Sequence, residues 1–411
     1  MPWQELSPVN LRMHFVTDWQ SGCWTMTELC AEYQISRKTG YKWVERYASS
    51  GPQGLHDHSR RPHHSPQATD PALIDALLAI RRRHPRWGAP KLLTVAARQD
   101  REAAWPSRST VCDHLQAQGL VAARRRRRPH LRGDTSLAPI TRVNQTWTTD
   151  FKGHFRTGDG VYCYPLTLRD GFSRFVLRCD ALPGPTYTAT RRRFERAFAE
   201  YGLPERIRSD NGAPFAGTGL GRLSRLSVWW IRLGIVPERI ALGRPDQNGS
   251  HEQFHAVLKG ETARPPARHA AAQQRRFGRF CREYNHERPH AALANAVPAS
   301  GYAPSPRALP RQLPALEYPG HFEIRRVSTI GQVSWRGAVV FLSEALAGED
   351  VAFEEIDEGI WTLRFATIAL ARYNDRYRSI HPIASPSAAG RSASSAGSAP
   401  DIKNKHNDPH P

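Results

Sequence analysis

The chain has 411 residues, 39% of them hydrophobic, and its 58 Lys and Arg against 38 Asp and Glu give a formal net charge of +20. This length predicts two to four domains, and the charge indicates a polyanionic partner such as DNA or RNA, with a solvated arginine-rich surface as the alternative. No apolar run approaches membrane-spanning length, no signal peptide opens the chain and the six cysteines form no C-x-x-C pair, which argues against a membrane protein or a disulfide framework and favours a cytoplasmic protein near the nucleoid.

Residues 1–50 are predicted to form a helix-turn-helix domain. Thr25 and Glu28 have the spacing of a capping box, and Ser36 can cap the following helix. In that second helix an apolar stripe is formed by Gly40, Trp43, Val44 and Tyr47. The same helix exposes the basic residues Arg37, Lys38 and Lys42, which we expect to contact DNA. A small helical bundle with a solvated basic face is the alternative.

Residues 51–69 are rich in Gly, Pro and His and are predicted to be a linker. Residues 70–123 then resemble a second helix-turn-helix, in which Asp70 caps one helix and Ser107 or Ser109 begins another. Arg108 is the DNA-contact candidate of this domain. A basic linker, residues 124–140, follows and contains the consecutive arginines Arg124, Arg125, Arg126, Arg127 and Arg128. Such a run repels itself unless it meets phosphates, so we expect it to lie on DNA, with a merely solvated linker as the alternative.

Residues 141–300 are predicted to form an α/β domain. Alternating apolar segments at 147–152, 161–169 and 174–179 are typical of strands joined by tight turns. Residues 188–201 have helical periodicity, and a short strand is expected at 206–209. This order predicts a mixed sheet with helices packed on it.

The C-terminal part is predicted to contain a small all-β domain. A Pro-rich linker spans residues 301–318, and short alternating segments between 319 and 381 are sufficient for a small β-barrel. Residues 382–411 are rich in Ser, Ala, Pro and Gly and are expected to be a disordered tail.

Three carboxylates in the α/β domain are the strongest functional candidates. Asp150 lies in an apolar strand, where a lone carboxylate is costly unless it is paired or faces a cleft. Asp210 ends a strand and precedes the turn residues Asn211 and Gly212, and strand ends of α/β sheets commonly face ligands. A turn or capping role is the alternative for each Asp taken alone.

The third carboxylate, Glu252, follows a polar loop that includes Gln247. The helix predicted over residues 250–259 places Glu252, His255 and Lys259 at i, i+3 and i+7, on one face. We expect this face to offer an acid and two groups suited to phosphate, unless it is simply a solvated amphipathic face. Hard divalent cations take such oxygen ligands.

Four segments in this order resemble the integrase-core signature of the DDE transposases, which are insertion-sequence proteins related to retroviral integrases. The segments are 148–151 (TTDF), 209–215 (SDNGAPF), 249–252 (GSHE) and 284–290 (YNHERPH). The resemblance covers about residues 140–300, and the order of the four segments is more specific than any one of them.

This resemblance implies an RNase H-like catalytic core in which Asp150, Asp210 and Glu252 bind two Mg²⁺ or Mn²⁺ ions. It implies DNA cleavage and strand transfer at the terminal inverted repeats of a mobile element, with two ions stabilising the attacking and leaving oxygens. It further implies that His255 and Lys259 face double-stranded DNA, that Asn211, Gly212 and Gln247 belong to an active-site loop, and that the protein acts as a homo-oligomer on DNA.

One departure from the family pattern is the long interval between Asp210 and Glu252. Its additional residues, about 218–235, are expected to form an extra helix at the edge of the core. Glu238 and Asp246 are the alternative third carboxylates, although neither has the helical context of Glu252. A non-catalytic DNA-binding regulator and a nuclease of the same fold remain the alternative functions.

Overall fold

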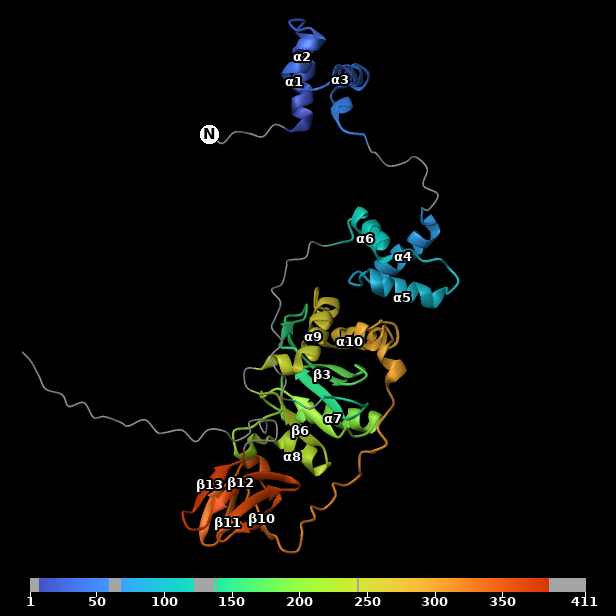
Figure 1. Cartoon of the computed structure of the whole chain (residues 1–411). Coiled ribbons are helices and arrows are strands. Elements are labelled where there is room, and N and C mark those ends of the chain that lie inside the picture. The colour runs from blue at the N-terminus through green and yellow to red at the C-terminus, as the bar shows by residue number, and fades with distance from the viewer. Residues whose placement is uncertain (1–6, 59–67, 122–136, 138, 242–243, 384–411) are drawn as a thin grey trace, which may run out of the picture. The chain divides into compact units, whose positions relative to one another are not determined.

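The computed structural model describes residues 7–58, 68–121, 137, 139–241 and 244–383. It divides the chain into two compact units, one ending at Asp70 and one beginning at Pro71, and each is described by itself (Figure 1). Within the described residues no helix is both long and apolar enough to cross a membrane. The predicted arginine run and the tail from residue 384 lie outside the described residues.

The first unit packs three described helices around a small apolar core. They are α1 (Pro8–Gln20), α2 (Met26–Glu32) and α3 (Arg37–Ser50). Thr25 and Glu28 form the predicted capping box of α2, and Ser36 caps α3. A Cβ atom at Gly40 would lie 2.7–2.9 Å from side-chain atoms of α1 and α2, so glycine lets α3 approach both helices closely. The core extends past the predicted boundary at residue 50, because Leu55 in the short helix η1 (Gly51–Leu55) is fully buried.

The second unit begins with a group of helices followed by a mixed sheet. The helices are α4 (Pro71–Arg83), α5 (Ala89–Gln99) and α6 (Arg108–Ala117). Their shared core contains Leu77, Trp87, Leu92 and Val111. Ser107 caps α6, as one of the two predicted alternatives.

The mixed sheet provides the frame on which the predicted carboxylates lie. Its strands are β1 (Thr146–Phe151), β2 (Phe155–Arg156), β3 (Tyr162–Asp170), β4 (Val176–Leu182), β5 (Arg206–Ser209) and β6 (Val236–Arg239). Strand β3 pairs antiparallel with β1 and β4, whereas β5 runs parallel to both β1 and β6. The strand order β2-β3-β1-β5-β6, with β4 beside β3, confirms the predicted mixed sheet.

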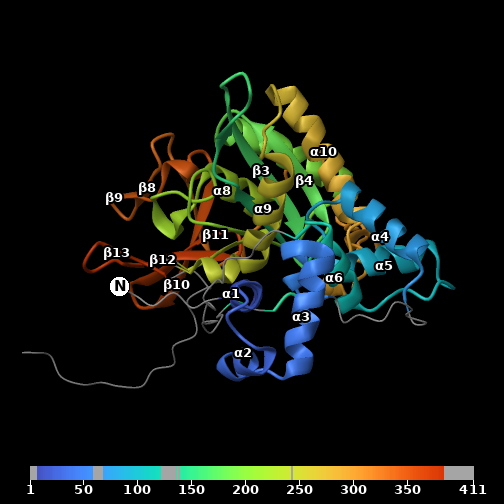
Figure 2. The ribbon, with the colours of Figure 1, turned by 90° about the horizontal axis from the view of Figure 1, so that it is seen from above.

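Helices cover both faces of this sheet and form two separate cores. On one face, α7 (Tyr187–Tyr201) and α8 (Arg225–Arg232) pack Phe194, Phe198 and Trp230 against Trp147. The other face carries α9 (Gly249–Thr262) and α10 (Ala270–His286), which lie against β3 and β4 (Figure 2). The sheet is therefore covered by helices on both sides.

Helix α8 lies in the interval expected to hold an extra helix, and it joins the core to the C-terminal domain. Trp229 and Trp230 belong to the core of the mixed sheet, whereas Val228 and Ile231 pack with the C-terminal strands. Arg232 also forms an ion pair of 2.6 Å with Glu349. One short helix thus contributes to two cores.

The predicted C-terminal β-barrel is not confirmed, because the described strands form open sheets. One sheet has the order β13-β12-β11-β10-β7, and β8 pairs only with β9. The strands are β7 (Glu323–Arg326), β8 (Gln332–Trp335), β9 (Ala338–Phe341), β10 (Asp350–Asp357), β11 (Ile360–Phe365), β12 (Ile368–Asn374) and β13 (Ser379–Pro382). Trp335 of the two-stranded sheet stacks on Phe353 at 3.8 Å between ring centroids. The β8-β9 hairpin and α8 therefore cover the apolar face of the larger sheet, which a closed barrel would bury in its interior.

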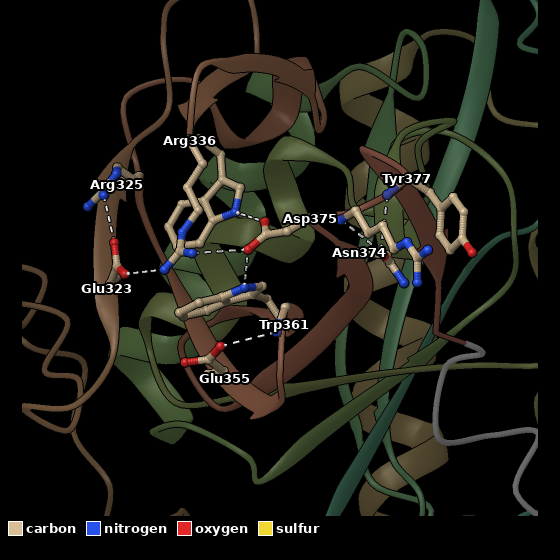
Figure 3. Close-up of polar contacts among 11 residues, drawn as sticks. Glu323, Arg325, Arg336, Glu355, Trp361, Asn374, Asp375 and Tyr377 are labelled. Carbon is tan, nitrogen blue, oxygen red and sulfur yellow. Dashed lines mark hydrogen bonds and ion pairs between the residues drawn. The ribbon is translucent and has the colours of Figure 1, made fainter.

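A polar cluster ties the hairpin to the larger sheet. Asp375 accepts hydrogen bonds from the indole nitrogens of Trp335 and Trp361, at 3.1 and 2.8 Å, and forms an ion pair with Arg336 (Figure 3). Because both indoles are buried, this carboxylate satisfies donors that would otherwise be costly to desolvate.

The Pro-rich segment predicted as a linker is bound along the core. Arg307 donates to the carbonyl oxygens of Pro204, Leu233 and Gly234. Near the start of the same segment, the ring of Tyr302 stacks on the ring of Phe175, with 4.3 Å between the ring centroids. The segment has little regular secondary structure, yet its side chains are fixed against the sheet.

Candidate active site

Asp150 and Asp210 lie at neighbouring strand ends of the mixed sheet. Strands β1 and β5 are parallel, with Thr148 opposite Arg208. Continuing this register by two residues along both strands places the backbone of Asp150 beside that of Asp210, at the spacing of adjacent strands, about 4.8 Å. Because side chains two residues apart on a strand point to the same face, Asp150 points to the same face as Thr148, and Asp210 to the same face as Arg208. Both carboxyl groups therefore project from one edge of the sheet.

The electrostatics of this edge favour a cation. Burial, and secondly the charge of Asp210, raise the pKa of Asp150 to about 7, with Glu252 adding a smaller effect in the same direction. Burial also raises the pKa of Asp210, although the N–H of Gly212 opposes the shift. Among the described residues, neither carboxylate forms an ion pair with Lys or Arg. Their negative charges are thus poorly compensated by the protein itself.

Glu252 lies in the first turn of α9 and is exposed. Its charge acts on Asp150, but no three His, Cys, Asp or Glu side chains converge into a ready-made metal site in the described chain. The alternative Glu238 is held in an ion pair of 2.6 Å with Arg208, and the side chain of Asp246 lies outside the described residues. Two crowded aspartates and one accessible glutamate form an all-oxygen donor set that fits Mg²⁺ or Mn²⁺.

Beneath Asp150, two buried histidines meet one hydroxyl group. The Nε2 atoms of His251 and His255 each lie 2.7 Å from Oγ1 of Thr167, and this hydroxyl donates to the backbone carbonyl of Asp150 at 2.9 Å. Because the single hydroxyl proton is used there, both imidazoles are assigned as Nε2–H donors. Nδ1 of His251 faces the hydroxyl of Thr148 at 2.8 Å. The network fastens α9 to β1 and β3.

The prediction that His255 faces DNA is inconsistent with its position, because the side chain is buried. Its Nδ1 atom lies 3.5 Å from Oδ2 of Asp150. Burial, followed by the charges of Lys152 and Arg169, lowers the pKa of His255 to about 3. The ring is therefore neutral and does not compensate the charge of Asp150. Sequence reasoning did not select its partners Thr167 and His251.

Lys259, by contrast, is exposed one turn farther along α9. Together with Lys152 and His154 it lines a small pocket beside the end of β1. Of these groups, Lys152 carries a positive charge that acts on Asp150. The structure therefore brings Lys259, but not His255, to the accessible surface near the carboxylates.

The predicted loop residues lie close to the strand ends. The side-chain amide of Asn211 donates to the carbonyl of Ile240 at 2.7 Å, and Gly212 donates its N–H to Asp210 at 3.1 Å. Gln247 is buried, and its side-chain oxygen accepts from the N–H of Ala241 at 2.7 Å. Asn211 and Gln247 thus both fasten the chain that follows β6, and we interpret them as supports of the loop.

The remaining DNA-contact candidates are exposed basic residues outside the sheet. Arg37, Lys38 and Lys42 lie on α3, and Arg108 begins α6. The ammonium group of Lys42 lies 4.1 Å from the centroid of the Trp43 ring. Their exposure permits contact with DNA, which stays a prediction. The candidates Arg124, Arg125, Arg126, Arg127 and Arg128 lie outside the described residues.

Comparison with known families places this site in a recognised domain. Integrase core domain models match residues 140–245 and 233–298. A helix-turn-helix domain model matches residues 11–63, and a homeodomain-like domain model matches residues 39–115. These matches, together with the insertion-element relatives below, support an insertion-sequence transposase of the DDE integrase superfamily. The two integrase-core matches together contain the strand-end aspartates, Glu252 and the buried histidines of this chain.

Two curated relatives come from bacterial insertion elements. An uncharacterized 31.7 kDa protein of insertion element IS407 from Burkholderia multivorans is 26% identical over 251 residues, which are 60% of this chain and 85% of that protein. An uncharacterized 39.2 kDa protein of insertion element IS476 from Xanthomonas euvesicatoria is 27% identical over 187 residues. The matched residues are 45% of this chain and 51% of that protein.

Solved structures with detectable likeness include viral integrases. The catalytic core domain of HTLV-2 integrase in complex with magnesium is 16% identical, with a TM-score of 0.30 over 39% of this chain and 97% of that one. A chain of the simian T-cell lymphotropic virus intasome, in complex with a PP2A regulatory subunit, is 15% identical, with a TM-score of 0.34 over 75% of this chain and 99% of the other.

Proposed function

We propose that this transposase binds the terminal inverted repeats of an insertion sequence and catalyses DNA cleavage and strand transfer with divalent metal ions. The observation that carries the proposal is the pair Asp150 and Asp210, which neighbouring parallel strands place side by side without a Lys or Arg partner among the described residues. Partly buried carboxylates in such a pair are unstable as anions unless a cation joins them.

The proposed metal ligands are three carboxylates of the chain. Asp150, Asp210 and Glu252 would hold the Mg²⁺ or Mn²⁺ ions, two of which we propose for the reaction. Bound divalent ions lower the pKa of a water or 3′-hydroxyl nucleophile and stabilise the leaving oxygen of an in-line displacement. Glu252 is exposed, so a modest change in its side-chain rotamer would direct its carboxylate to the aspartates.

Other groups position the carboxylates and the DNA. His255 donates to the hydroxyl of Thr167, which in turn donates to the backbone carbonyl of Asp150, and this limits the movement of the ligand. Lys152 and Lys259 beside the strand end would contact phosphates that flank the scissile bond. No covalent protein–DNA intermediate is required.

Recognition of the element ends is assigned to the helical domains. Arg37, Lys38 and Lys42 on α3 and Arg108 on α6 would contact DNA, with the arginine run 124–128 and the C-terminal sheets adding phosphate contacts. Pairing of two ends requires at least two catalytic cores on the DNA, so we propose a homo-oligomer in the active complex.

A strand-transfer assay tests the proposal. DNA carrying the sequences that flank this gene is incubated with Mg²⁺ or Mn²⁺ and either the wild type or Asp210→Asn. We expect joined products from the wild type alone, with equal binding of DNA by both proteins. Nicked products without joining would assign a nuclease instead. Tight binding without either product would assign a DNA-binding regulator.

A further inference from the structure

A second site is present beside α9, in a cavity of about 200 Å³. Ser250, Gln253 and Val257 contribute to its wall from α9, and Arg169 contributes from β3. The described lining does not include Asp150, Asp210 or Glu252. The cavity is therefore separate from the carboxylate edge, although both use the same helix.

Positive charge dominates the lining of this cavity. Its cationic residues are Lys91, Arg169, Arg174 and Arg288. Arg288 is paired with Glu261 at 2.8 Å. Within the described residues no carboxylate lines the cavity, and no ion pair satisfies Lys91, Arg169 or Arg174. The site thus carries an excess of cations in a sheltered place, where an anion is bound more strongly than at an open surface.

Arg169 is the most informative of these cations. The residue is only 2% exposed, and one terminal nitrogen donates to Oγ of Ser250 at 2.5 Å. Its Nε–H has no hydrogen-bond partner in the described part of the chain, and the guanidinium lies 5.5 Å from the centroid of the Phe254 ring. An unpaired buried donor is costly, the more so on a charged group. A guanidinium held in this way is prepared for an anionic acceptor.

Neighbouring titratable groups report the same excess of positive charge. Burial, and secondly the charge of Arg288, lower the pKa of Lys91 to about 8. Burial, followed by the charges of Lys91 and Arg288, lowers the pKa of His290 to about 3, and Nε2 of this ring also lacks a partner among the residues described. Two unsatisfied polar atoms and three cations without an ion-pair partner among the described residues therefore meet at one cavity, although the charge of Glu261 partly offsets that of Lys91 and Asp170 partly offsets that of Arg169.

We propose that this cavity binds a phosphate group of the DNA backbone, which the structure assigns to Lys91, Arg169 and Arg174. A phosphodiester offers oxygen acceptors in several directions and fits a cavity of this size, whereas an extended acidic peptide does not. Arginine favours phosphate because its donors form a planar fork. The inference rests on the proposed function, since it takes DNA as the source of the phosphate.

The proposed phosphate site and the proposed metal ligand Glu252 lie on the same helix, α9. Ser250 lines the cavity, and Glu252 follows two residues later, about 3 Å along the helix axis. Residues two apart on a helix project in different directions, so the cavity and Glu252 lie on different sides of α9, separated by the width of the helix, about 10 Å. The anchor fixes the register of the DNA against the three carboxylates without reading its sequence.

Inorganic phosphate is the first probe. Thermal unfolding of the full chain is followed in sodium phosphate and in sodium chloride of equal ionic strength, for the wild type, Lys91→Ala and Arg174→Ala. Arg282→Ala, an exposed position on α10, is the matched control. We expect phosphate to stabilise the wild type and the control more than the two cavity variants. Equal stabilisation of all four proteins would overturn the proposal.

The salt dependence of DNA binding tests the source of the phosphate. One lost phosphate contact lowers the slope of log K against log [salt] by about 0.9. Because Lys91 and Arg174 share one phosphate, we expect each single variant and the double variant to lose the same amount, about 0.9, and the Arg282→Ala control to lose none. Losses that add to about 1.8 would indicate independent surface contacts and refute the shared site.

These outcomes separate the inference from the proposed function. Phosphate binding with an unchanged DNA slope would show a site for a free anion and overturn the assignment to DNA. Asp210→Asn should keep both the phosphate response and the slope, because it lies outside the cavity. An absence of strand transfer together with the expected slopes would refute the proposed function while leaving the DNA-phosphate site supported.

Discussion

Replacing Asp150 with Asn should stabilise the metal-free transposase at pH 8. In the folded chain this carboxyl has a pKa of about 7, raised mainly by burial and then by the charge of Asp210. The charges of Glu252 and Lys152 act in opposite directions, and the neutral ring of His255 adds no charge. Asn has nearly the same shape as Asp and carries no charge, so the substitution removes the free-energy cost of ionising a partly buried carboxyl group.

The sign and size follow from proton linkage. The ordinary pKa of an Asp carboxyl exposed to water, as in the unfolded chain, is 3.8, so between about pH 4 and 7 the folded chain binds more protons at Asp150 than the unfolded chain. Stability therefore falls as pH rises through this window and levels off above it. The folded and unfolded pKa values differ by about 3, which at about 1.36 kcal/mol for each pH unit gives roughly 4 kcal/mol. Asp150→Asn should gain up to this amount at pH 8 and almost nothing at pH 4.

Unfolding of the core can be followed by the fluorescence of its buried tryptophans, including Trp147 and Trp230. Asp113→Asn, at an exposed position on α6, is the control for the change in net charge. Mg²⁺ should stabilise the wild type at pH 8, by about 2.7 kcal/mol at 100 times the dissociation constant, and should leave Asp150→Asn unchanged. Equal stability of wild type and Asp150→Asn at pH 8 would refute the reasoning about the paired carboxylates.

His255→Gln should lower strand transfer about 10–100-fold and raise the Mg²⁺ concentration needed for half-maximal joining, with DNA binding unchanged; an unaltered metal dependence would show that His255 does not position Asp150. Combined Arg37→Ala and Lys38→Ala should lower the salt slope of DNA binding by as much as about 1.8 if each residue contacts a phosphate, and an unchanged slope would place both residues in solvent. Trp335→Ala should destabilise the C-terminal sheets by about 3–5 kcal/mol, measured as an earlier unfolding transition, and a loss below about 1 kcal/mol would show that the stack on the sheet is dispensable.

The sequence predicted those elements whose pattern is local. Strand β5 occupies the predicted positions 206–209, and strands β7 to β12 lie within the segment 319–381 that was predicted to contain short strands. Strands β6 and β13 were not predicted; β6 contains a Pro and β13 ends at one, which weakens the strand signal. Helix α5 was not predicted either. The closed barrel was wrong because closure depends on long-range pairing, which alternation along one chain does not specify.

At the site, Asp150 and Asp210 were selected from their strand and turn context, and the sheet places them as neighbours. His255 was assigned to DNA because its spacing places it on one helical face with Glu252 and Lys259 and because the family resemblance implied it. The buried side of α9 contains His251, Phe254, His255, Leu258 and Thr262. Their spacing of i, i+3, i+4, i+7 and i+11 is that of a core-facing stripe. His255 fits both spacings, and the structure places it in the buried one.

The buried histidines explain how α9 can serve two sites at once. An apolar stripe alone would tolerate a small slide of the helix, whereas His251 and His255 must both reach the hydroxyl of Thr167. A slide would leave these buried groups unsatisfied, at about 1–3 kcal/mol for each. The network thereby fixes the register of α9 on β3. With that register set, the charge of Glu252 acts on Asp150 while Ser250 lines the cationic cavity, so the proposed catalytic edge and the proposed phosphate anchor keep a constant separation.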